Sequence, residues 1–431
     1  MSAAAQPLVV VTEWGARGAE LLGLLLLVLG VTAQLYRRML AHSQPPSLRA
    51  AMAIAAGGLL AAFFSPVLFS SDVYAYAAYG EMARLGANPY AHAGPRLLSD
   101  ALISAAAWQW NGTLPICLYG PAFVALAKAL IVLLAPIGML AQLDGLRVTA
   151  SAAFLLCGPL AFAAYRGNRI VRLRAVATIL LNPAAIWCAA EGHNDAIALC
   201  GVLAGFALVR RRLDAPGAAL AALAALVKLP AAAAAAGLAL VDRRARIGAV
   251  AGLAVAAAFS IPLFTGFATQ LAPRGHYAPQ ASLQAVLAPF GPAVALPVAA
   301  IVAAILVAAG VRRLRREQPD GWIWLGLGTW LLIPNPYPWY GLWLIALAAT
   351  APRSPPGRTA VLLSLTSLLR YAPDAITTPP AGLQVALGLL AVLPLLALLP
   401  RRRHRFVARP VIMSDPYDRR DNRFAGSSPT R

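Results

Sequence analysis

Charged residues are scarce in this chain. They make up 12% of its 431 residues, against about 25% in soluble globular proteins, whereas hydrophobic residues reach 60%. This composition excludes a series of ordinary soluble domains and is typical of a chain embedded in lipid. At about 20 apolar residues per crossing, it allows at most about 13 transmembrane helices. We therefore expect an all-α polytopic membrane protein, and reading the apolar runs between the basic clusters gives about 13 transmembrane helices.

Cysteine is also rare, and the signatures of soluble cofactor-binding enzymes are absent. The four cysteines show no paired spacing, which excludes a disulfide framework and a zinc ribbon. The chain has no G-x-G-x-x-G after a strand, no G-x-x-x-x-G-K-[ST], no H-E-x-x-H and no G-x-S-x-G. Without a soluble nucleotide-binding domain, we expect an activated substrate that is lipid-borne in the outer leaflet. We expect no cofactor, and the lack of a dense carboxylate cluster predicts no metal.

Acidic residues are few, at 16 against 36 basic residues, so the formal net charge is +20. In a soluble protein this excess would suggest a nucleic-acid partner. Here the basic clusters fall between apolar runs, and the positive-inside rule places them in the cytoplasm. This arrangement predicts an N-terminus outside, a membrane domain over 1–400 and a basic, disordered cytoplasmic tail over 401–431. The clusters lie at 37–38, 166–174, 210–212, 243–246, 312–316, 353–358 and 401–405.

The bias among basic residues indicates the source membrane. Only Lys128 and Lys228 are lysine, and alanine runs are abundant, a pattern typical of a bacterial genome rich in G and C. We therefore expect a multi-pass protein of the bacterial cytoplasmic membrane.

The first long polar segment predicts a large extracytoplasmic loop. The apolar run 50–69 leaves the cytoplasm, and the basic cluster 166–174 must be inside again, so an odd number of crossings separates them. Two apolar runs lie between them, at 120–140 and 146–165. The first contains two prolines and a lysine, so we expect it to be re-entrant or interfacial. The predicted loop then spans 70–145.

Two later hairpins are too short for ordinary crossings. Between residues 214 and 242 each arm has only about 14 residues, or about 21 Å, short of a hydrocarbon core of about 30 Å. The turn at Lys228 is therefore expected below the outer surface, where a lysine must line a wet cavity or meet an anion. The same reasoning applies to 321–350, whose turn contains Trp339 and Tyr340. Interrupted helices of this kind line cavities at membrane depth.

Polar residues that could carry chemistry gather on the expected outer side. Asp72 follows a crossing immediately, and a carboxylate at the hydrocarbon boundary needs a reason. A second group lies in the turn of LNPAAIWCAAEGHNDAIAL, where helix capping explains only one of four polar side chains. The remaining candidates are Tyr76, Glu81, Arg147, His193, Asn194, Asp195, Arg274 and His276.

These segments together resemble a known family. The chain reads DVYAYAAYG and GANPY, then YGP, then LNP and GHNDA, then VKLP, over roughly residues 70–340. This order resembles the polyprenol-phosphate-mannose-dependent mannosyltransferases of the GT-C superfamily, especially the bacterial α-mannosyltransferases near glycosyltransferase family 87. Glu191 departs from that pattern as an extra acid. The resemblance implies a GT-C-like helical bundle whose first large outer loop carries the catalytic aspartate, a position that Asp72 matches.

The implied reaction assigns a role to each candidate. The resemblance implies a hexose, namely mannose, carried by a polyprenyl monophosphate and transferred with inversion to a lipid- or glycan-linked acceptor outside the cytoplasm. Asp72 is then the expected general base. Cations should stabilise the departing phosphate, and the candidates are Lys228, Arg274, His276 and Arg147. The expected sugar or acceptor contacts are Tyr76, Glu81, His193, Asn194, Asp195, Trp339 and Tyr340.

Two other classes of protein fit parts of the pattern. A secondary transporter also uses broken helices and buried charge, but no repeat relates the two halves of this chain. A flippase for lipid-linked sugars would bind the same ligand without transferring it. That function needs no base, so Asp72 distinguishes it from a transferase.

Overall fold

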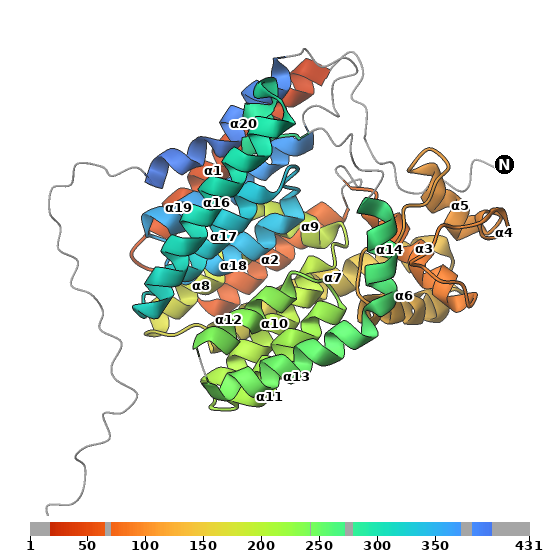
Figure 1. Ribbon diagram of the computed structural model, residues 1–431, viewed down its shortest axis with the longest axis horizontal. Coiled ribbons are helices and arrows are strands. Elements are labelled where there is room, and N and C mark those ends of the chain that lie inside the picture. The colour runs from red at the N-terminus through yellow and green to blue at the C-terminus, as the bar shows by residue number, and fades with distance from the viewer. Residues whose placement is uncertain (1–17, 65–69, 242, 272–278, 372–381, 399–431) are drawn as a thin grey trace, which may run out of the picture. The chain divides into compact units, whose positions relative to one another are not determined.

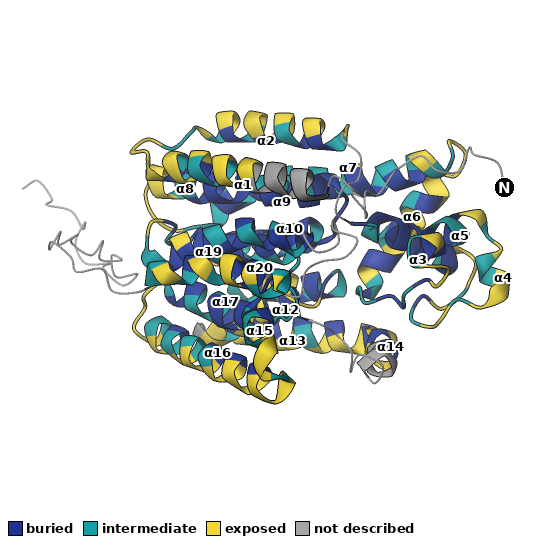
Figure 2. Ribbon diagram, turned by 90° about the horizontal axis from the view of Figure 1, so that it is seen from above, coloured by how far each residue is buried: buried dark blue, intermediate teal, exposed yellow. Residues whose placement is uncertain are grey.

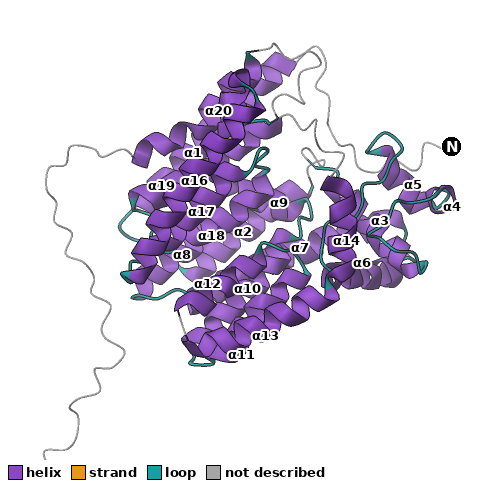
Figure 3. Ribbon diagram, in the orientation of Figure 1, coloured by secondary structure: helices purple, strands orange, loops and turns teal. Residues whose placement is uncertain are grey.

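The computed structural model describes residues 18–64, 70–241, 243–271, 279–371 and 382–398. These residues form helices joined by turns, with no strand among them (Figures 1 and 3). The all-α prediction is therefore confirmed for the described part of the chain. The predicted cytoplasmic tail, 401–431, lies outside it.

The helices fall into three stretches along the chain. The first holds α1 (Gly18–Ala41), α2 (Leu48–Phe63), α3 (Asp72–Arg84), α4 (Pro95–Leu98), α5 (Ala101–Trp108), α6 (Pro121–Leu134) and α7 (Met139–Ala164). The second holds α8 (Arg169–Leu180), α9 (Pro183–Ala190), α10 (Asp195–Arg210), α11 (Asp214–Leu223), η3 (Ala224–Leu226), α12 (Ala231–Val241), α13 (Arg243–Phe259) and α14 (Ile261–Leu271). The third holds α15 (Leu283–Leu287), η5 (Ala288–Phe290), α16 (Pro292–Arg315), α17 (Gly321–Leu332), η6 (Pro338–Tyr340), α18 (Gly341–Ala348), α19 (Pro355–Thr366), η7 (Ser367–Tyr371), α20 (Leu383–Val392) and η8 (Leu393–Leu398).

Few of these helices are long enough to cross a bilayer alone. Within the described residues, α7 and α16 are long and apolar enough, and the bent pair α8 and α9 would make a third span. Many others have 10–17 residues, such as α2, α6, α17 and α20. The predicted number of about 13 crossings therefore stays a prediction.

Proline and asparagine explain the break between α8 and α9. These helices meet at 54° where Asn182 precedes Pro183. The Asn182 side chain accepts a hydrogen bond from the Ala185 backbone N–H and so caps α9, whereas Pro183 cannot continue the ladder of α8. Proline also precedes α12, which begins after Pro230, and the prolines of 334–338 separate α17 from α18. The two predicted short hairpins are thus confirmed as pairs of short helices.

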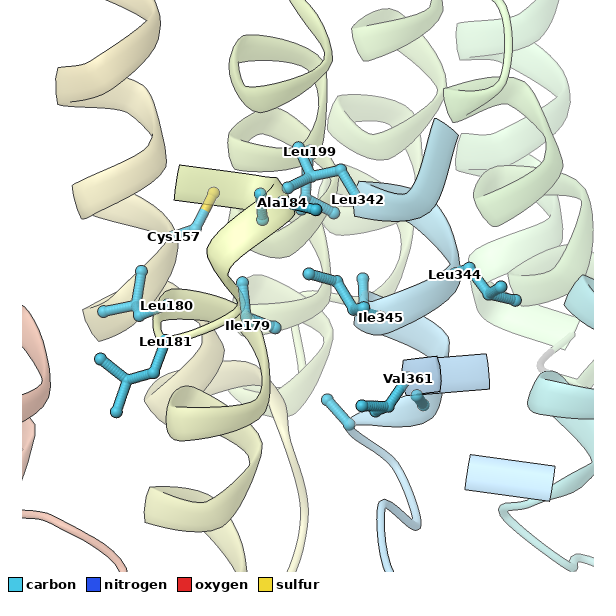
Figure 4. Close-up of a cluster of buried hydrophobic side chains, with 14 of the residues drawn as sticks. Cys157, Ile179, Leu180, Leu181, Ala184, Leu199, Leu342, Leu344, Ile345 and Val361 are labelled. Carbon is cyan, nitrogen blue, oxygen red and sulfur yellow. The ribbon is translucent and has the colours of Figure 1, made fainter. Parts of the chain in front are cut away.

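The main apolar core joins helices from distant parts of the chain. Figure 4 shows Cys157 of α7, Ile179 of α8, Leu199 of α10, Ile345 of α18 and Val361 of α19 converging in one cluster. All five side chains are buried. The segments α8–α10 and α17–α19, of eight to sixteen residues each, are therefore held by packing against one another, which compensates for the few hydrogen bonds that such short helices can make.

A second core lies under the predicted outer loop. Helices α3, α5 and α6 pack together with the first turns of α7 and gather at one end of the described residues in Figures 1 and 2. Tyr79, Phe123 and Leu143 contribute buried side chains to this core. Most of the run 120–140 thus forms α6, which packs against α3, and its last residues begin α7.

Outward-facing apolar side chains indicate contact with lipid. Exposed residues follow the outer helices α2 and α16 in Figure 2. Along α16 they include Leu296, Ile301 and Ile305, each more than half exposed. Such a continuous apolar face is rare on a soluble monomer and typical of a membrane helix. The apolar helices therefore indicate a membrane protein.

Candidate functional site

Asp72 begins α3 and lies between two tyrosine hydroxyls. Its backbone N–H donates to Ser70 Oγ at 3.2 Å, which fixes the start of the helix. Tyr76 follows one turn later, on the same face of α3, and its hydroxyl donates to Asp72 Oδ2 at 3.3 Å. The Tyr119 hydroxyl donates to the same oxygen at 3.2 Å. Two donors therefore hold Oδ2, whereas Oδ1 has no hydrogen-bond partner among the described residues.

A close backbone contact brings Tyr119 beside the Lys228 turn. The Gly120 N–H donates to Val227 O at 3.1 Å. A Cβ atom at Gly120 would lie only 2.1 Å from Leu226 O, so only glycine allows this approach. The YGP motif and the lysine-proline turn of the sequence thus form one structural unit, in which the Lys228 ammonium lies 5.4 Å from the Tyr119 ring centre.

Glycine also shapes the turn between α9 and α10. Gly192 has φ of 93°, a left-handed conformation that glycine adopts without strain. This turn brings His193 back toward α3, where its Nδ1 lies 3.4 Å from the Tyr76 hydroxyl and 3.8 Å from Asp72 Oδ2. The predicted grouping of Asp72 with the GHND turn is therefore present in the structure.

A buried ion pair lies next to this turn. The Lys228 ammonium donates to Asp195 Oδ2, and the Trp343 indole N–H donates to Asp195 Oδ1 at 2.7 Å. The exposed fractions of the Lys228 and Asp195 side chains are 8% and 1%. The expectation that Lys228 meets an anion is confirmed, because a buried ammonium without a partner would be very costly. The pair joins α10 to the α11–α12 turn, and Trp343 adds α18.

Stacked rings support the other side of His193. Trp339 stacks on His193, with ring centres 4.2 Å apart, and on Tyr337, with centres 4.4 Å apart. Trp339 is buried, whereas Tyr340 is half-buried and lies 5.8 Å from the Lys228 ammonium. Trp339 therefore already has two stacking partners and holds the His193 ring, whereas Tyr340 makes edge-to-face contacts with Trp339 and Tyr337.

Burial and nearby charges shift the pKa values of Asp72 and His193 in opposite directions. Burial raises the pKa of the Asp72 carboxyl above its usual value, while the Lys228 ammonium and the hydrogen bonds from Tyr119 and Tyr76 oppose that rise. Burial and the same ammonium keep the pKa of His193 well below its usual range. His193 is therefore a neutral imidazole near neutral pH, and Asp72 is more basic than an exposed aspartate with the same donors.

Arg147 is held by protein acceptors, which corrects its predicted role as a phosphate ligand. Its Nε donates to Ala190 O at 2.9 Å, and its Nη2 donates to Phe63 O at 2.7 Å. Both carbonyls belong to the last residue of a helix, α9 and α2, where they lack intrahelical partners. Its Nη1 pairs with Asp144 at 3.0 Å, and the side chain is 2% exposed. Arg147 thus caps two helices beneath the GHND turn.

This role predicts a loss of stability in Arg147→Met. The substitution leaves two buried helix-end carbonyls without a charged donor, and each such bond contributes about 1.5–3 kcal/mol. We expect the free energy of unfolding to fall by about 3 kcal/mol or more, measured as a lower Tm in detergent. Arg246→Met is the matched control, because that exposed arginine donates to a single carbonyl, and its Tm should stay near wild type. An unchanged Tm in Arg147→Met would contradict the capping role.

Glu81 also differs from its predicted role as a sugar contact. It forms an ion pair with Arg84, one turn further along α3, and its Oε2 accepts from Arg84 Nε at 2.7 Å. Nine residues separate it from Asp72, or about 13 Å along a helix, and they place it on the opposite face of α3. Glu81 is therefore a partner of Arg84 and does not join Asp72. The Asp72 cluster comprises Asp72, Tyr76, Tyr119, His193, Asp195, Lys228 and the residues that contact them. Arg274 and His276 lie outside the described residues.

Three further residues belong to the cluster, although their motifs alone did not assign them a role. Tyr119 lies in the YGP motif, and the place of this motif among the segments shared with the family was the signal that could have identified it. Glu191 lies 3.9 Å from His193 Nε2 and accepts from the Trp187 indole N–H at 2.8 Å. Trp343 lies in an apolar helix and gave no signal. No group of three or more metal-ligating side chains occurs in the part of the chain that the structure describes.

Two polar side chains in the turn have unused hydrogen-bonding groups. Both amide atoms of Asn194 and the Nε2 of His193 are buried with no partner among the described residues. Asn194 is fully buried, so its amide pays a desolvation cost that a ligand would relieve. These atoms are therefore available to the hydroxyl groups of a ligand.

Comparison with known proteins identifies a family. The model of the family described as alpha-(1->6)-mannopyranosyltransferase, N-terminal domain, matches residues 4–244, more than half of the chain. A search of curated proteins found no match to the chain, and neither did a search of solved structures. Asp72, Tyr119, the GHND turn and Lys228 lie within the matched stretch, whereas Trp339, Tyr340 and Trp343 follow it.

Proposed function

Because the chain belongs to the alpha-(1->6)-mannopyranosyltransferase family, and is therefore a glycosyltransferase that transfers mannose, we propose a donor, a base and a membrane side for its reaction. Mannose is transferred from a polyprenyl-phosphate donor to a lipid- or glycan-linked acceptor on the extracytoplasmic side of the bacterial cytoplasmic membrane. The absence of a nucleotide-binding motif supports a lipid-borne donor. Asp72 is the general base.

The accessibility of Asp72 carries this proposal. The Asp72 side chain is 22% exposed, against 1% for Asp195 and 4% for Glu191. Asp195 is held at both oxygens by Lys228 and Trp343, whereas Asp72 keeps Oδ1 open. Among the carboxylates of this cluster, Asp72 is thus the one that an acceptor hydroxyl can reach. Tyr76 and Tyr119 orient it without blocking it.

A single reachable carboxylate favours inversion. Asp72 Oδ1 takes the proton of the acceptor hydroxyl as that oxygen bonds to C1 and the bond from C1 to the phosphate oxygen breaks. The transition state resembles an oxocarbenium ion, and the polyprenyl phosphate leaves with the electron pair of the broken bond. Retention would need a second carboxylate as nucleophile, and the others here are buried and paired.

The departing phosphate needs positive charge near it. The described cluster holds three carboxylates, on Asp72, Glu191 and Asp195, and one ammonium, on Lys228. Lys228 has two further N–H groups besides the one given to Asp195, and we assign them to the phosphate. Arg274 and His276 remain the predicted additional cations, since a dianionic leaving group next to three carboxylates requires more charge than one lysine supplies.

The unused groups of the turn support sugar binding. The Asn194 amide, buried with no partner among the described residues, is assigned to a mannose hydroxyl. His193 is assigned to orienting Asp72 through Tyr76. Tyr340 is half-buried at the Lys228 end and is assigned to the sugar face or the first prenyl unit. Tyr76 orients Asp72 directly. Asp195 positions the Lys228 ammonium, and Trp339 positions the His193 ring.

Cysteine labelling tests the proposed side of the membrane. His92 and Arg212 are both exposed, so a thiol at either position is reachable in the folded protein. In a background without the four native cysteines, position 92 should react with an impermeant reagent added to intact cells. Position 212 should react only after the cells are opened. The reverse pattern would place the Asp72 cluster on the cytoplasmic side.

The donor is tested with purified protein in lipid. Radiolabelled mannose should be transferred from polyprenyl-phosphate mannose but not from a sugar nucleotide, and transfer should persist in excess chelator, since we propose no metal. Glucose on the same lipid should be a poor donor. Transfer from the sugar nucleotide alone would contradict the proposed donor, and loss of transfer in chelator would contradict the proposed independence of metal.

A further inference from the structure

His193 lies between two carboxylates that approach different ring nitrogens. Asp72 Oδ2 lies 3.8 Å from Nδ1, and Glu191 Oε2 lies 3.9 Å from Nε2. Both distances exceed a direct hydrogen bond, but each is short enough for the charge to act on the ring. Glu191 and His193 are both buried, so solvent screens this interaction poorly. The charge of Glu191 can therefore act on the His193 ring.

Two sets of contacts keep the ring in this orientation. Trp339 stacks on it with planes 21° apart, which limits rotation out of the plane. The backbone N–H of His193 donates to Cys188 O at 3.1 Å, and Trp187 of the same helix holds the Glu191 carboxylate. Glu191, two residues before His193, thus faces the ring edge opposite Asp72 by construction of the turn.

The charge of Glu191 favours one tautomer of His193. A protonated Nε2 directs the positive end of its N–H bond toward the carboxylate, whereas an Nε2 lone pair would be repelled by it. Nδ1 then carries a lone pair, which faces the Tyr76 hydroxyl at 3.4 Å. Because Tyr76 has one proton, His193 Nδ1 and Asp72 Oδ2 share it.

We propose that Glu191 is a positioning residue that acts on the Asp72 base through His193, by holding the imidazole in its Nε2-protonated form. In that form Nδ1 withdraws part of the Tyr76 hydrogen bond from Asp72 and so makes its carboxylate a better proton acceptor. In the other tautomer, an Nδ1 proton would face Tyr76 and Asp72 and would stabilise the carboxylate against protonation.

Other titratable groups also surround His193, and a test must distinguish their effects from that of Glu191. Asp195 begins α10 and pairs with Lys228 of the turn before α12. Tyr340 of η6 and Tyr371 of η7 pack near Trp339, the ring that stacks on His193. Burial, and then the Lys228 ammonium, lower the pKa of His193, so the ring is neutral and the question is which nitrogen carries its proton. A test must therefore report the position of one proton on one ring.

Magnetic resonance of isotopically labelled histidine supplies that report. The chain has five histidines, and the His193 signal is the one lost in His193→Asn. At pH about 8, above the ordinary histidine pKa of about 6.5, ring carbon and nitrogen shifts distinguish the two neutral tautomers. We expect Nε2-protonated His193 in the wild type and in Glu191→Asp, and a mixed or Nδ1-protonated ring in Glu191→Gln. Glu81→Gln, which removes a carboxylate bound to Arg84 in α3, should leave the His193 signal unchanged.

The kinetic consequence rests on the proposed function, whereas the tautomer does not. In Glu191→Gln we expect kcat to fall by less than the roughly 10²–10⁴ that a lost base costs, with the donor KM unchanged and partial recovery in Glu191→Asp. An Nδ1-protonated wild-type ring, or an unchanged ring in Glu191→Gln, would overturn the inference and leave the Asp72 assignment intact. A wild-type protein that transfers no sugar from polyprenyl phosphate would refute the proposed function and leave the tautomer result to stand alone.

Discussion

Asp72→Asn should lower the turnover of mannose transfer by about 10³-fold while the protein remains folded and inserted. A general base contributes about 10²–10⁴ in rate, and an amide cannot take the acceptor proton. The substitution preserves shape, and an amide nitrogen or oxygen can still meet the Tyr76 and Tyr119 hydroxyls. Donor KM should therefore change little, and turnover of radiolabelled donor at saturation is the measurement.

A matched control lies in the same predicted loop. Asp100 accepts from the Leu102 and Ile103 backbone N–H groups at the start of α5, and asparagine caps a helix equally well. Asp100→Asn should therefore retain near wild-type turnover. Wild-type turnover in Asp72→Asn would refute the base, and an equal loss in both variants would indicate a fault of the loop rather than of the chemistry.

Breaking the Lys228–Asp195 pair should have the largest effect on stability. Lys228→Met leaves Asp195 as a buried carboxylate with only the Trp343 donor, and removing one partner of a buried pair costs about 3–5 kcal/mol. Turnover should also fall by about 10²–10³-fold, the cost of one lost donor to a developing negative charge. Thermal unfolding in detergent and single-turnover transfer measure the two effects separately.

The double variant separates structure from chemistry. Lys228→Met with Asp195→Asn removes both charges, so we expect much of the lost stability to return, since neutral replacements of buried pairs are often tolerated. Turnover should stay low, because the phosphate still lacks its ammonium. If turnover returned together with stability, Lys228 would be a structural residue and the phosphate would be bound elsewhere.

The site residues that lie in short polar segments could be predicted from the sequence. Asp72, His193 and Lys228 were predicted from short polar segments in apolar surroundings, and the structure brings all three together. The short hairpins followed from length alone, because the arms could not span a bilayer. The odd number of required crossings and two prolines assigned the run 120–140 to the outer loop, whereas its packing as α6 on α3 is a finding of the structure.

Other features depended on contacts that a single sequence does not show. Trp343 reaches Asp195 across 148 positions, and no local pattern marks it in α18. Arg147 was assigned to phosphate because it lies at the outer end of a crossing, whereas the fold places two helix ends against it. Asp144, three residues before Arg147, was a local signal that Arg147 is paired. Arg84, three residues after Glu81, was the same signal for Glu81. A nearby opposite charge one turn away is therefore evidence against a free catalytic role.

The most direct test of the Asp72 base uses a nucleophile that carries no proton. Asp72→Ala should fail to transfer mannose to its hydroxyl acceptor, yet with added azide it should form mannosyl azide at a rate close to that of the wild type. The product should have the opposite anomeric configuration to the donor, since attack still displaces the phosphate from the other face. Loss of azide transfer together with hydroxyl transfer, in a folded variant that still binds donor, would contradict the account. It would show that Asp72 serves the donor side of the reaction and not the acceptor proton.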